Sequence, residues 1–182
     1  MSIGMKRGTV YLEAHQSAWE QSAAETAAAL YAALSGLHIE IQHVGSTAIR
    51  TIKAKPIIDI AVAAADFDEI LARNAELAAH QIIFRLDERP RELLYVKGDL
   101  SADTRTHHIH VVRMDSQEWQ NYLNFRDYLN ANAEAASEYE AWKERLAAQY
   151  PADRNAYTDG KSEIIARFLR EAAEWRTQMQ NT

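Results

Sequence analysis

The segment 39–63 reads IEIQHVGSTAIRTIKAKPIIDIAVA, and its pattern decides the fold of the chain. Apolar and polar side chains alternate over residues 39–44, which is typical of a short β-strand. Gly45 breaks this alternation and ends the strand. Residues 56–63 are apolar on both faces apart from one aspartate, which predicts a central strand covered on both sides. The segment therefore predicts two strands of one sheet, with a Gly-Ser-Thr turn after the first.

Helical spacing on either side of this segment predicts the flanking helices. Apolar residues three and four apart, in an alanine-rich background, predict a helix over residues 15–36. Asp66 and Glu69 have the spacing of a capping box and predict a helix that runs to about residue 79. Asp115 and Glu118 have the same spacing and begin the first of several C-terminal helices. Further strands are expected at 82–86, 93–97 and 106–113, and the last helices around 139–146 and 164–175.

Together these elements predict an α+β fold. It consists of a mixed sheet of about five strands, with flanking helices and a helical C-terminal third. A chain of 182 residues can form one domain with a real core, whereas two full domains would be tight. We expect a single domain over residues 1–182, with a helix-plus-sheet core over 1–114 and a helical part over 115–182. The C-terminal helices could close over the sheet as a lid or form a homodimer surface.

The composition excludes several classes of protein. The chain has no cysteine, which excludes disulfides, zinc–thiolate sites and cysteine nucleophiles. A formal net charge of −6 disfavours direct DNA binding, which depends on Lys and Arg contacts with phosphates. A local basic pocket could still hold a small nucleotide. The chain has neither a signal-peptide pattern nor an apolar run of ~20 residues, so we expect a cytoplasmic protein that does not contact a membrane.

Asp59 is the one charged residue in the apolar strand 56–63. A buried carboxylate without a partner costs several kcal/mol, so Asp59 must have one. The pattern leaves two kinds of partner open. One is a buried ion pair with Lys53, Lys55 or an arginine, and the other is a divalent metal ion.

The Gly45-Ser46-Thr47 turn also has two interpretations. An ordinary turn that caps a short helix explains it on local grounds. Alternatively, glycine lets a ligand approach the backbone, and the hydroxyl and N–H groups at a helix start can donate to phosphate oxygens. On this second interpretation the three residues bind a nucleotide phosphate, and Arg50 adds a positive charge beside the turn.

Three histidines could complete a metal site with the aspartate. His108 and His110 lie two apart on a predicted strand and therefore share one face of the sheet. Together with Asp59 and His43 they could hold a divalent cation, namely Mg²⁺, Mn²⁺ or Zn²⁺. The alternative is a pair of half-buried histidines that hydrogen-bond within the sheet. His107 points to the opposite face, and we expect it at the surface.

These motifs resemble those of the GrpB (UPF0157) family, in the nucleotidyltransferase superfamily related to DNA polymerase β. A Gly-Ser turn, twelve further residues and then an aspartate in a buried strand resemble the superfamily signature. The sequences of segments 43–48 and 54–60 are similar to those of GrpB proteins. The resemblance implies the nucleotidyltransferase fold, with His110 near the place where such enzymes carry a later acid. It continues at residues 108–110, 125–129, 153–154, 157 and 161.

The chain departs from the polymerase pattern at one point. Such transferases usually carry two acids spaced Asp-x-Asp or Asp-x-Glu on the first catalytic strand, but Asp59-Ile60-Ala61 has no second acid. Two-metal phosphoryl transfer needs ligands that bridge both ions. The missing acid therefore leaves three hypotheses. The protein is a metal-dependent nucleotidyltransferase, an inactive module that binds nucleotide or metal, or a single-metal phosphohydrolase.

In the leading hypothesis the protein is a nucleotidyltransferase whose substrate is a small-molecule nucleotide. Asp59, His110 and Lys55 are its candidate catalytic residues. Lys161, on a C-terminal helix that could close over the site, is expected to reach a phosphate. A solvated surface position is the simpler explanation of each lysine taken alone, and convergence of the lysines on one pocket would overturn it.

Overall fold

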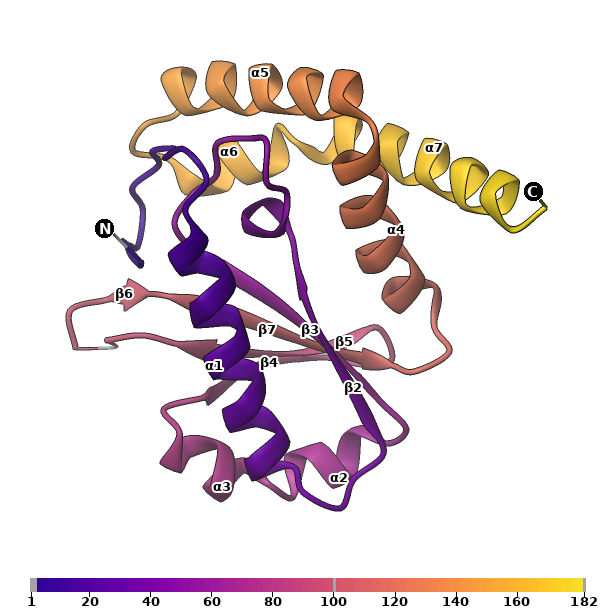
Figure 1. Ribbon diagram of the computed structural model, residues 1–182. Coiled ribbons are helices and arrows are strands. Elements are labelled where there is room, and N and C mark those ends of the chain that lie inside the picture. Colours follow the sequence, from indigo (N-terminus) through magenta and orange to yellow (C-terminus); the bar gives the residue numbers. More distant parts are fainter. Residues whose placement is uncertain (1–2, 100, 182) are drawn as a thin grey trace.

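A five-stranded mixed sheet forms the centre of the fold in the computed structural model, which describes residues 3–99 and 101–181 (Figure 1). The strands lie in the order β2-β3-β7-β5-β4. Only β3 and β7 run parallel, and every other neighbouring pair is antiparallel. The strands are β2 (Ile39–Val44), β3 (Ile58–Ala64), β4 (Ile83–Glu88), β5 (Glu92–Lys97) and β7 (His107–Arg113). The predicted mixed sheet of about five strands is therefore confirmed.

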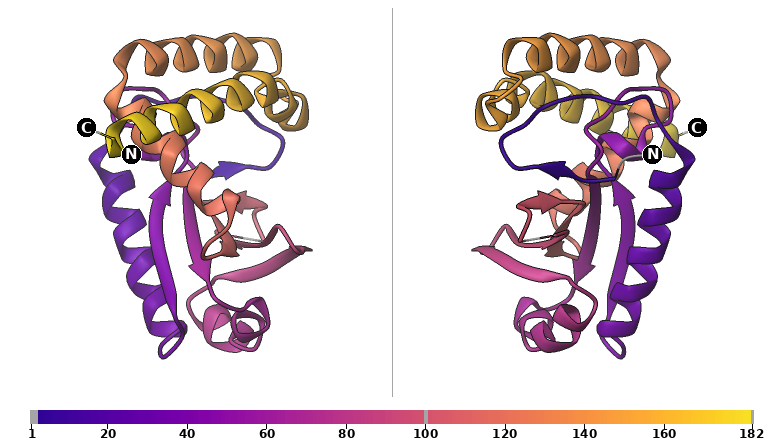
Figure 2. Two further views of the ribbon diagram at one scale, coloured as in Figure 1. Left: turned by 90° about the vertical axis from the view of Figure 1, so that its right-hand side faces the viewer. Right: turned by 90° about the vertical axis from the view of Figure 1, so that its left-hand side faces the viewer.

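Helices cover the sheet on both faces (Figure 2). One face packs against α1, and α4 crosses the other face over β2, β3 and β7. The helices α4, α5 and α7 share a hydrophobic cluster with Ile49 and Ile52, which follow the Gly-Ser turn. The helices are α1 (Ser17–Ala33), α2 (Phe67–Leu71), α3 (Asn74–Ala79), α4 (Gln117–Ala131), α5 (Ala133–Gln149), α6 (Arg154–Asp159) and α7 (Ser162–Gln180).

Successive side chains of β3 pack on opposite faces of the sheet, because side chains alternate along a strand. Residues Ile58, Ile60 and Val62 of β3 join the core beneath α1. The residues between them, Ala61 and Ala63, pack under α4 in a smaller cluster. Buried apolar residues on both faces account for the almost continuous apolar run that marks β3 in the sequence.

Three local features differ from the sequence prediction. The predicted helix over 66–79 is two short helices, α2 and α3, and Asp66 caps the first through the backbone N–H of Asp68. Ser116, and not Asp115, caps α4. Its hydroxyl oxygen accepts a hydrogen bond from the backbone N–H of Trp119, three residues later. The sequence patterns also missed α6 and the two-stranded pair of β1 (Met5–Lys6) and β6 (Thr104–Arg105), which are too short for a period to emerge.

None of the helices in the described residues is both long and apolar enough to span a bilayer.

Candidate functional site

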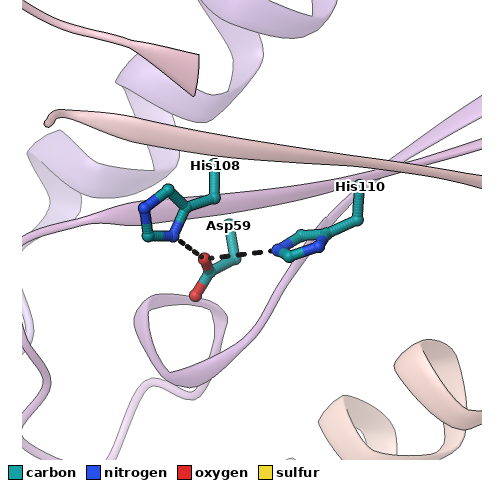
Figure 3. Close-up of side chains that lie close together, drawn as sticks. All are labelled: Asp59, His108 and His110. Carbon is teal, nitrogen blue, oxygen red and sulfur yellow. Dashed lines mark ion pairs between the residues drawn. The ribbon is translucent and has the colours of Figure 1, made fainter. Parts of the chain in front are cut away.

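Asp59, His108 and His110 converge on the face of the sheet opposite α1 (Figure 3). The parallel pairing of β3 with β7 sets Asp59 beside His108 and Ala61 beside His110. His108 Nδ1 lies 3.3 Å from Asp59 Oδ1, and His110 Nε2 lies 3.8 Å from the same oxygen. One ligand atom from each residue falls within 4.8 Å of the others. The expected convergence of these three residues is therefore present, and Asp59 has histidines as partners in place of Lys53 or Lys55.

Gly45 makes room for the aspartate. It has a φ of +68°, and a Cβ at this position would lie 2.4 Å from Asp59 Oδ2, well inside van der Waals contact. The close approach that the glycine permits is thus with the carboxylate of the neighbouring strand. After Gly45 the short 3₁₀ helix η1 (Ser46–Ala48) begins, and Ser46 faces the same cavity as Asp59, where its side chain contacts the phenol of Tyr139.

The two histidines respond differently to the same aspartate. Burial disfavours a charged Asp59, but hydrogen bonds and charges from His108 and His110 outweigh it, so the pKa of the carboxyl lies far below its usual range. Burial also opposes a charge on His110, yet contacts with Asp59 and Glu92 raise the pKa of His110 to about 9. Burial lowers the pKa of His108, and its contact with Asp59 offsets this only in part. His110 is therefore the histidine that carries the charge opposite Asp59.

Behind His110 lies a carboxylate that the sequence patterns missed. Glu92 Oε2 is 3.3 Å from His110 Nδ1, and the Tyr122 hydroxyl donates to the same oxygen at 3.2 Å. Glu92 begins β5, one residue before the predicted start of that strand. Had the strand been extended by one residue, the period of two would have placed Glu92 on the face of His110.

The cavity around the cluster has a volume of about 770 Å³ and lies between the sheet and the C-terminal helices. Its wall carries Lys55, Arg154 and Lys161. The ammonium nitrogens of Lys55 and Lys161 each lie 4.8 Å from the centre of the buried Tyr157 ring. Arg154, which was predicted only as part of the family resemblance, lies 3.3 Å from His108 Nε2. The lysines that the sequence singled out therefore converge on one pocket.

These cations lack acidic partners of their own. Within residues 3–99 and 101–181, none of the three forms an ion pair with a carboxylate. Burial, followed by repulsion from Lys161 and Arg154, lowers the pKa of Lys55 to about 7. Burial likewise lowers the pKa of Lys161. Three half-buried cations that repel one another are costly, and an anionic ligand would relieve that cost.

Three of the predicted ligand-binding residues lie elsewhere. His43 pairs with Ile60 across the sheet, so its ring points to the α1 face, away from Asp59, and its proposed place in the metal cluster is corrected. Its Nε2 lies 2.9 Å from Thr47 Oγ1, and Thr47 is buried in this contact without reaching the cavity. Arg50 is exposed and paired with Glu20 at 2.9 Å, beside a separate surface depression.

His107 also departs from its prediction. It points to the α1 face, as expected, but it is only 3% exposed because α1 covers it. Its Nε2 lies 3.2 Å from Ser22 Oγ and 3.1 Å from Thr26 Oγ1, and its Nδ1 lies 2.9 Å from Thr106 Oγ1. The expected surface position is therefore wrong, and both ring nitrogens are satisfied inside the fold.

The donor atoms at Asp59 fit a divalent cation. Ligand atoms of a tetrahedral ion with bonds of ~2.1 Å lie ~3.4 Å apart. The 3.8 Å between Asp59 Oδ1 and His110 Nε2 is close to this spacing, whereas the 3.3 Å between Asp59 Oδ1 and His108 Nδ1 also fits a hydrogen bond. A mixture of imidazole nitrogen and carboxylate oxygen suits Zn²⁺ or Mn²⁺ better than Mg²⁺, which prefers oxygen ligands. The side chains of the three residues are between 19% and 30% exposed, so an ion can reach them from the cavity.

Comparison with solved structures defines the class of fold. The Cid1 poly(U) polymerase bound to Mg 3′-dATP matches with a TM-score of 0.53 and 15% identity, over 82% of this chain and 49% of the polymerase. Cid1 in complex with its short product ApU matches with the same TM-score and 12% identity, over 82% of this chain and 48% of that chain. The protein thus has a nucleotidyltransferase-like fold.

Relatives of higher similarity define the family. The GrpB protein family model matches residues 9–171. The glutamate-rich protein GrpB of Alkalihalophilus pseudofirmus is 34% identical over 172 residues, which cover 93% of this chain and 99% of the relative. The crystal structure of the conserved protein GrpB from Enterococcus faecalis matches with a TM-score of 0.84 and 28% identity, over 91% of this chain and 99% of that one. The chain belongs to the GrpB family.

Proposed function

We propose that this protein binds the phosphates of a small-molecule nucleotide together with a divalent cation, and that it catalyses nucleotidyl transfer in the cavity at Asp59. One observation carries the proposal. The Asp59, His108 and His110 cluster and the unpaired cations Lys55, Arg154 and Lys161 line the same cavity. The fold shared with Cid1, whose structures include one bound to Mg 3′-dATP, supports the same class of ligand.

The Asp59–histidine cluster and the three cations would act on different parts of the nucleotide. Asp59 and the histidine cluster would hold the cation, which when bound neutralises negative charge on a phosphate and polarises it for attack. Lys55, Lys161 and Arg154 would bind the remaining phosphate oxygens, where fixed positive charges stabilise the charge that develops during transfer. Ser46 lies at the edge of the cavity, where its hydroxyl can reach a phosphate. The nearby tyrosines would exclude water from the reacting atoms.

A catalytically inactive binding module is the second candidate, and Ala61 favours it. Ala61 occupies the position two residues after Asp59, where polymerase-type transferases carry a second acid, and it is fully buried beside His110. This protein would hold one cation with fewer carboxylates than a two-metal centre needs. Such a site can keep a nucleotide without turning it over.

Pyrophosphate release separates the two candidates. The purified protein is incubated with each nucleoside triphosphate and Mn²⁺, Zn²⁺ or Mg²⁺, and release and nucleotide binding are both measured. The proposal expects release that is lost in Asp59→Asn and kept in Asp115→Asn, an exposed aspartate outside the cavity. Binding without release identifies the module. An absence of both binding and release, with every cation, overturns the proposed function.

A further inference from the structure

His108 and His110 face the same oxygen of Asp59, but their outer nitrogens have opposite kinds of partner. The outer nitrogen of His108, Nε2, lies 3.3 Å from the guanidinium of Arg154. The outer nitrogen of His110, Nδ1, lies 3.3 Å from the carboxylate of Glu92. The partner of each outer nitrogen determines which ring nitrogen carries the proton, and so what the inner nitrogen can offer Asp59 or a cation.

Arg154 fixes His108 as a hydrogen-bond donor toward Asp59. A guanidinium has only N–H donors, so the Nε2 of His108 must accept from Arg154. A neutral imidazole that accepts at Nε2 carries its proton on Nδ1. That Nδ1–H points to Asp59 Oδ1 at 3.3 Å (Figure 3). In this arrangement the inner nitrogen of His108 has no lone pair to give a metal ion.

Glu92 has the reverse effect on His110. The carboxylate of Glu92 accepts, and it also receives the hydroxyl of Tyr122 at 3.2 Å, so the Nδ1 of His110 is the donor of that pair. The Nε2 of His110 faces Asp59 Oδ1 across 3.8 Å. In the charged ring this nitrogen carries the second proton, which a divalent cation displaces on binding while Nδ1–H keeps its bond to Glu92. This is the arrangement in which a carboxylate orients a ligating histidine through its outer N–H.

We infer that the two histidines have different roles in the cation site. His110, oriented by Glu92, is the imidazole ligand that joins Asp59 on the ion, whereas His108, held by Arg154, donates to Asp59 and fixes the carboxylate in place. Glu92 and Arg154 are therefore positioning residues, one for the ligand and one for the donor. This inference rests on the proposed function only in requiring that a divalent cation binds at Asp59.

Nitrogen NMR of the histidine rings tests the assignment directly. Protein labelled with ¹⁵N in histidine is studied without metal and then with Zn²⁺, which is diamagnetic. Without metal, His108 is expected to carry its proton on Nδ1. On Zn²⁺ addition, Nε2 of His110 is expected to move to the chemical shift of a metal-bound nitrogen, while both nitrogens of His108 keep their shifts. A metal-bound shift at Nδ1 of His108 overturns the inference.

Calorimetric titration with Zn²⁺ tests Glu92 as the positioning residue. Glu92→Gln is expected to weaken Zn²⁺ binding by about 10–100-fold, the usual effect of losing the partner of a ligating histidine. Glu118→Gln is the matched control, because Glu118 lines the same cavity and forms no ion pair with either histidine among the described residues. Equal affinities for the two variants overturn the role of Glu92.

The role of Arg154 has its own variant. Arg154→Met removes the donor at His108 Nε2 and is expected to let His108 exchange between its two neutral tautomers in the metal-free protein. A His108 that keeps its proton on Nδ1 in Arg154→Met overturns the role of Arg154. Failure of the proposed function is distinguishable from these outcomes, since it appears as an absence of nucleotide binding and pyrophosphate release, whereas the roles of the histidines are measured from ring tautomers and Zn²⁺ affinity.

Discussion

The two faces of the sheet are built from the same strands but have different properties. On the face under α1, His107 is buried and both its ring nitrogens meet hydroxyl groups. On the face toward the C-terminal helices lie His108 and His110 of the same strand. Both border the cavity and contact charged side chains. The alternation of side chains along β3 and β7 therefore separates residues that stabilise the fold from residues that form the site.

Single substitutions at adjacent positions test this separation of roles between the two faces of the sheet. A substitution on the α1 face should change the free energy of unfolding and leave ligand binding intact in the folded fraction. A substitution on the cavity face should change binding more than stability.

The largest effect is expected for Ile60→Ala on the α1 face. Ile60 is 1% exposed in the main core, and truncating such a residue costs ~2–5 kcal/mol of unfolding free energy. Urea denaturation measures the loss, and Zn²⁺ titration of the folded variant checks the site. Asp59→Asn, the adjacent residue on the other face, should destabilise less and lose Zn²⁺ binding. The reverse ranking of the two variants would contradict the division between the faces.

The next effect is expected for Gly45→Ala, where the first strand meets the site. The new Cβ would overlap the Asp59 carboxylate in a backbone conformation that already disfavours side chains, which should cost ~2–4 kcal/mol. Gly36→Ala is the control, because Gly36 has a φ of +85° and open space around its Cβ position. Thermal or urea unfolding gives the difference between them, which isolates the overlap with Asp59. Equal costs would mean that the contact is unimportant.

A smaller effect is expected for His107→Leu. This change removes the buried partner of the Thr26 hydroxyl, whereas the Thr106 hydroxyl keeps its bond to the Lys97 carbonyl, and it should cost ~1–3 kcal/mol. His110→Leu provides the comparison on the other face, where the loss should fall mainly on Zn²⁺ affinity. Urea unfolding and calorimetric titration of both variants are required. Loss of Zn²⁺ binding in a well-folded His107→Leu variant would refute the separation.

The last prediction is a pH dependence that belongs to the cavity face, with a slope of at most ~1.4 kcal/mol per pH unit. Lys55 has an ordinary pKa of 10.5 when unfolded and a pKa of about 7 in the fold. Between these values the unfolded chain binds more protons, so the free energy of unfolding rises as pH increases from about 7 to about 10.5. Lys55→Met should reduce this slope in urea unfolding measured across that range. Lys6→Met, at an exposed position in β1, should not.

The sequence predicted the fold well because its strongest signals are local. The alternation over 39–44 and the apolar run over 56–63 correspond to β2 and β3 within two residues at each end. Period two also placed His108 and His110 on one face and His107 on the other, as the structure has them. It could not show that α1 would cover His107, because covering depends on how distant segments pack.

The site was harder to predict because its members depend on register and tertiary position. His43 was grouped with Asp59 by closeness in sequence, whereas the antiparallel register of β2 with β3 sets it opposite Ile60 and on the other face. Glu92 was missed at a strand boundary, where pattern reasoning is least accurate. The contact of Arg154 with His108 joins residues 46 positions apart, and no local pattern encodes it.

The burial of Ala61 beside His110 has a consequence for protein engineering. Conversion of this centre into a two-acid transferase would require Ala61→Asp as its first substitution. The new carboxylate would enter a position without solvent, in the cluster that also holds Val44 and Trp119, and next to an imidazole that already has a carboxylate behind it. A single replacement should therefore misfold or displace His110.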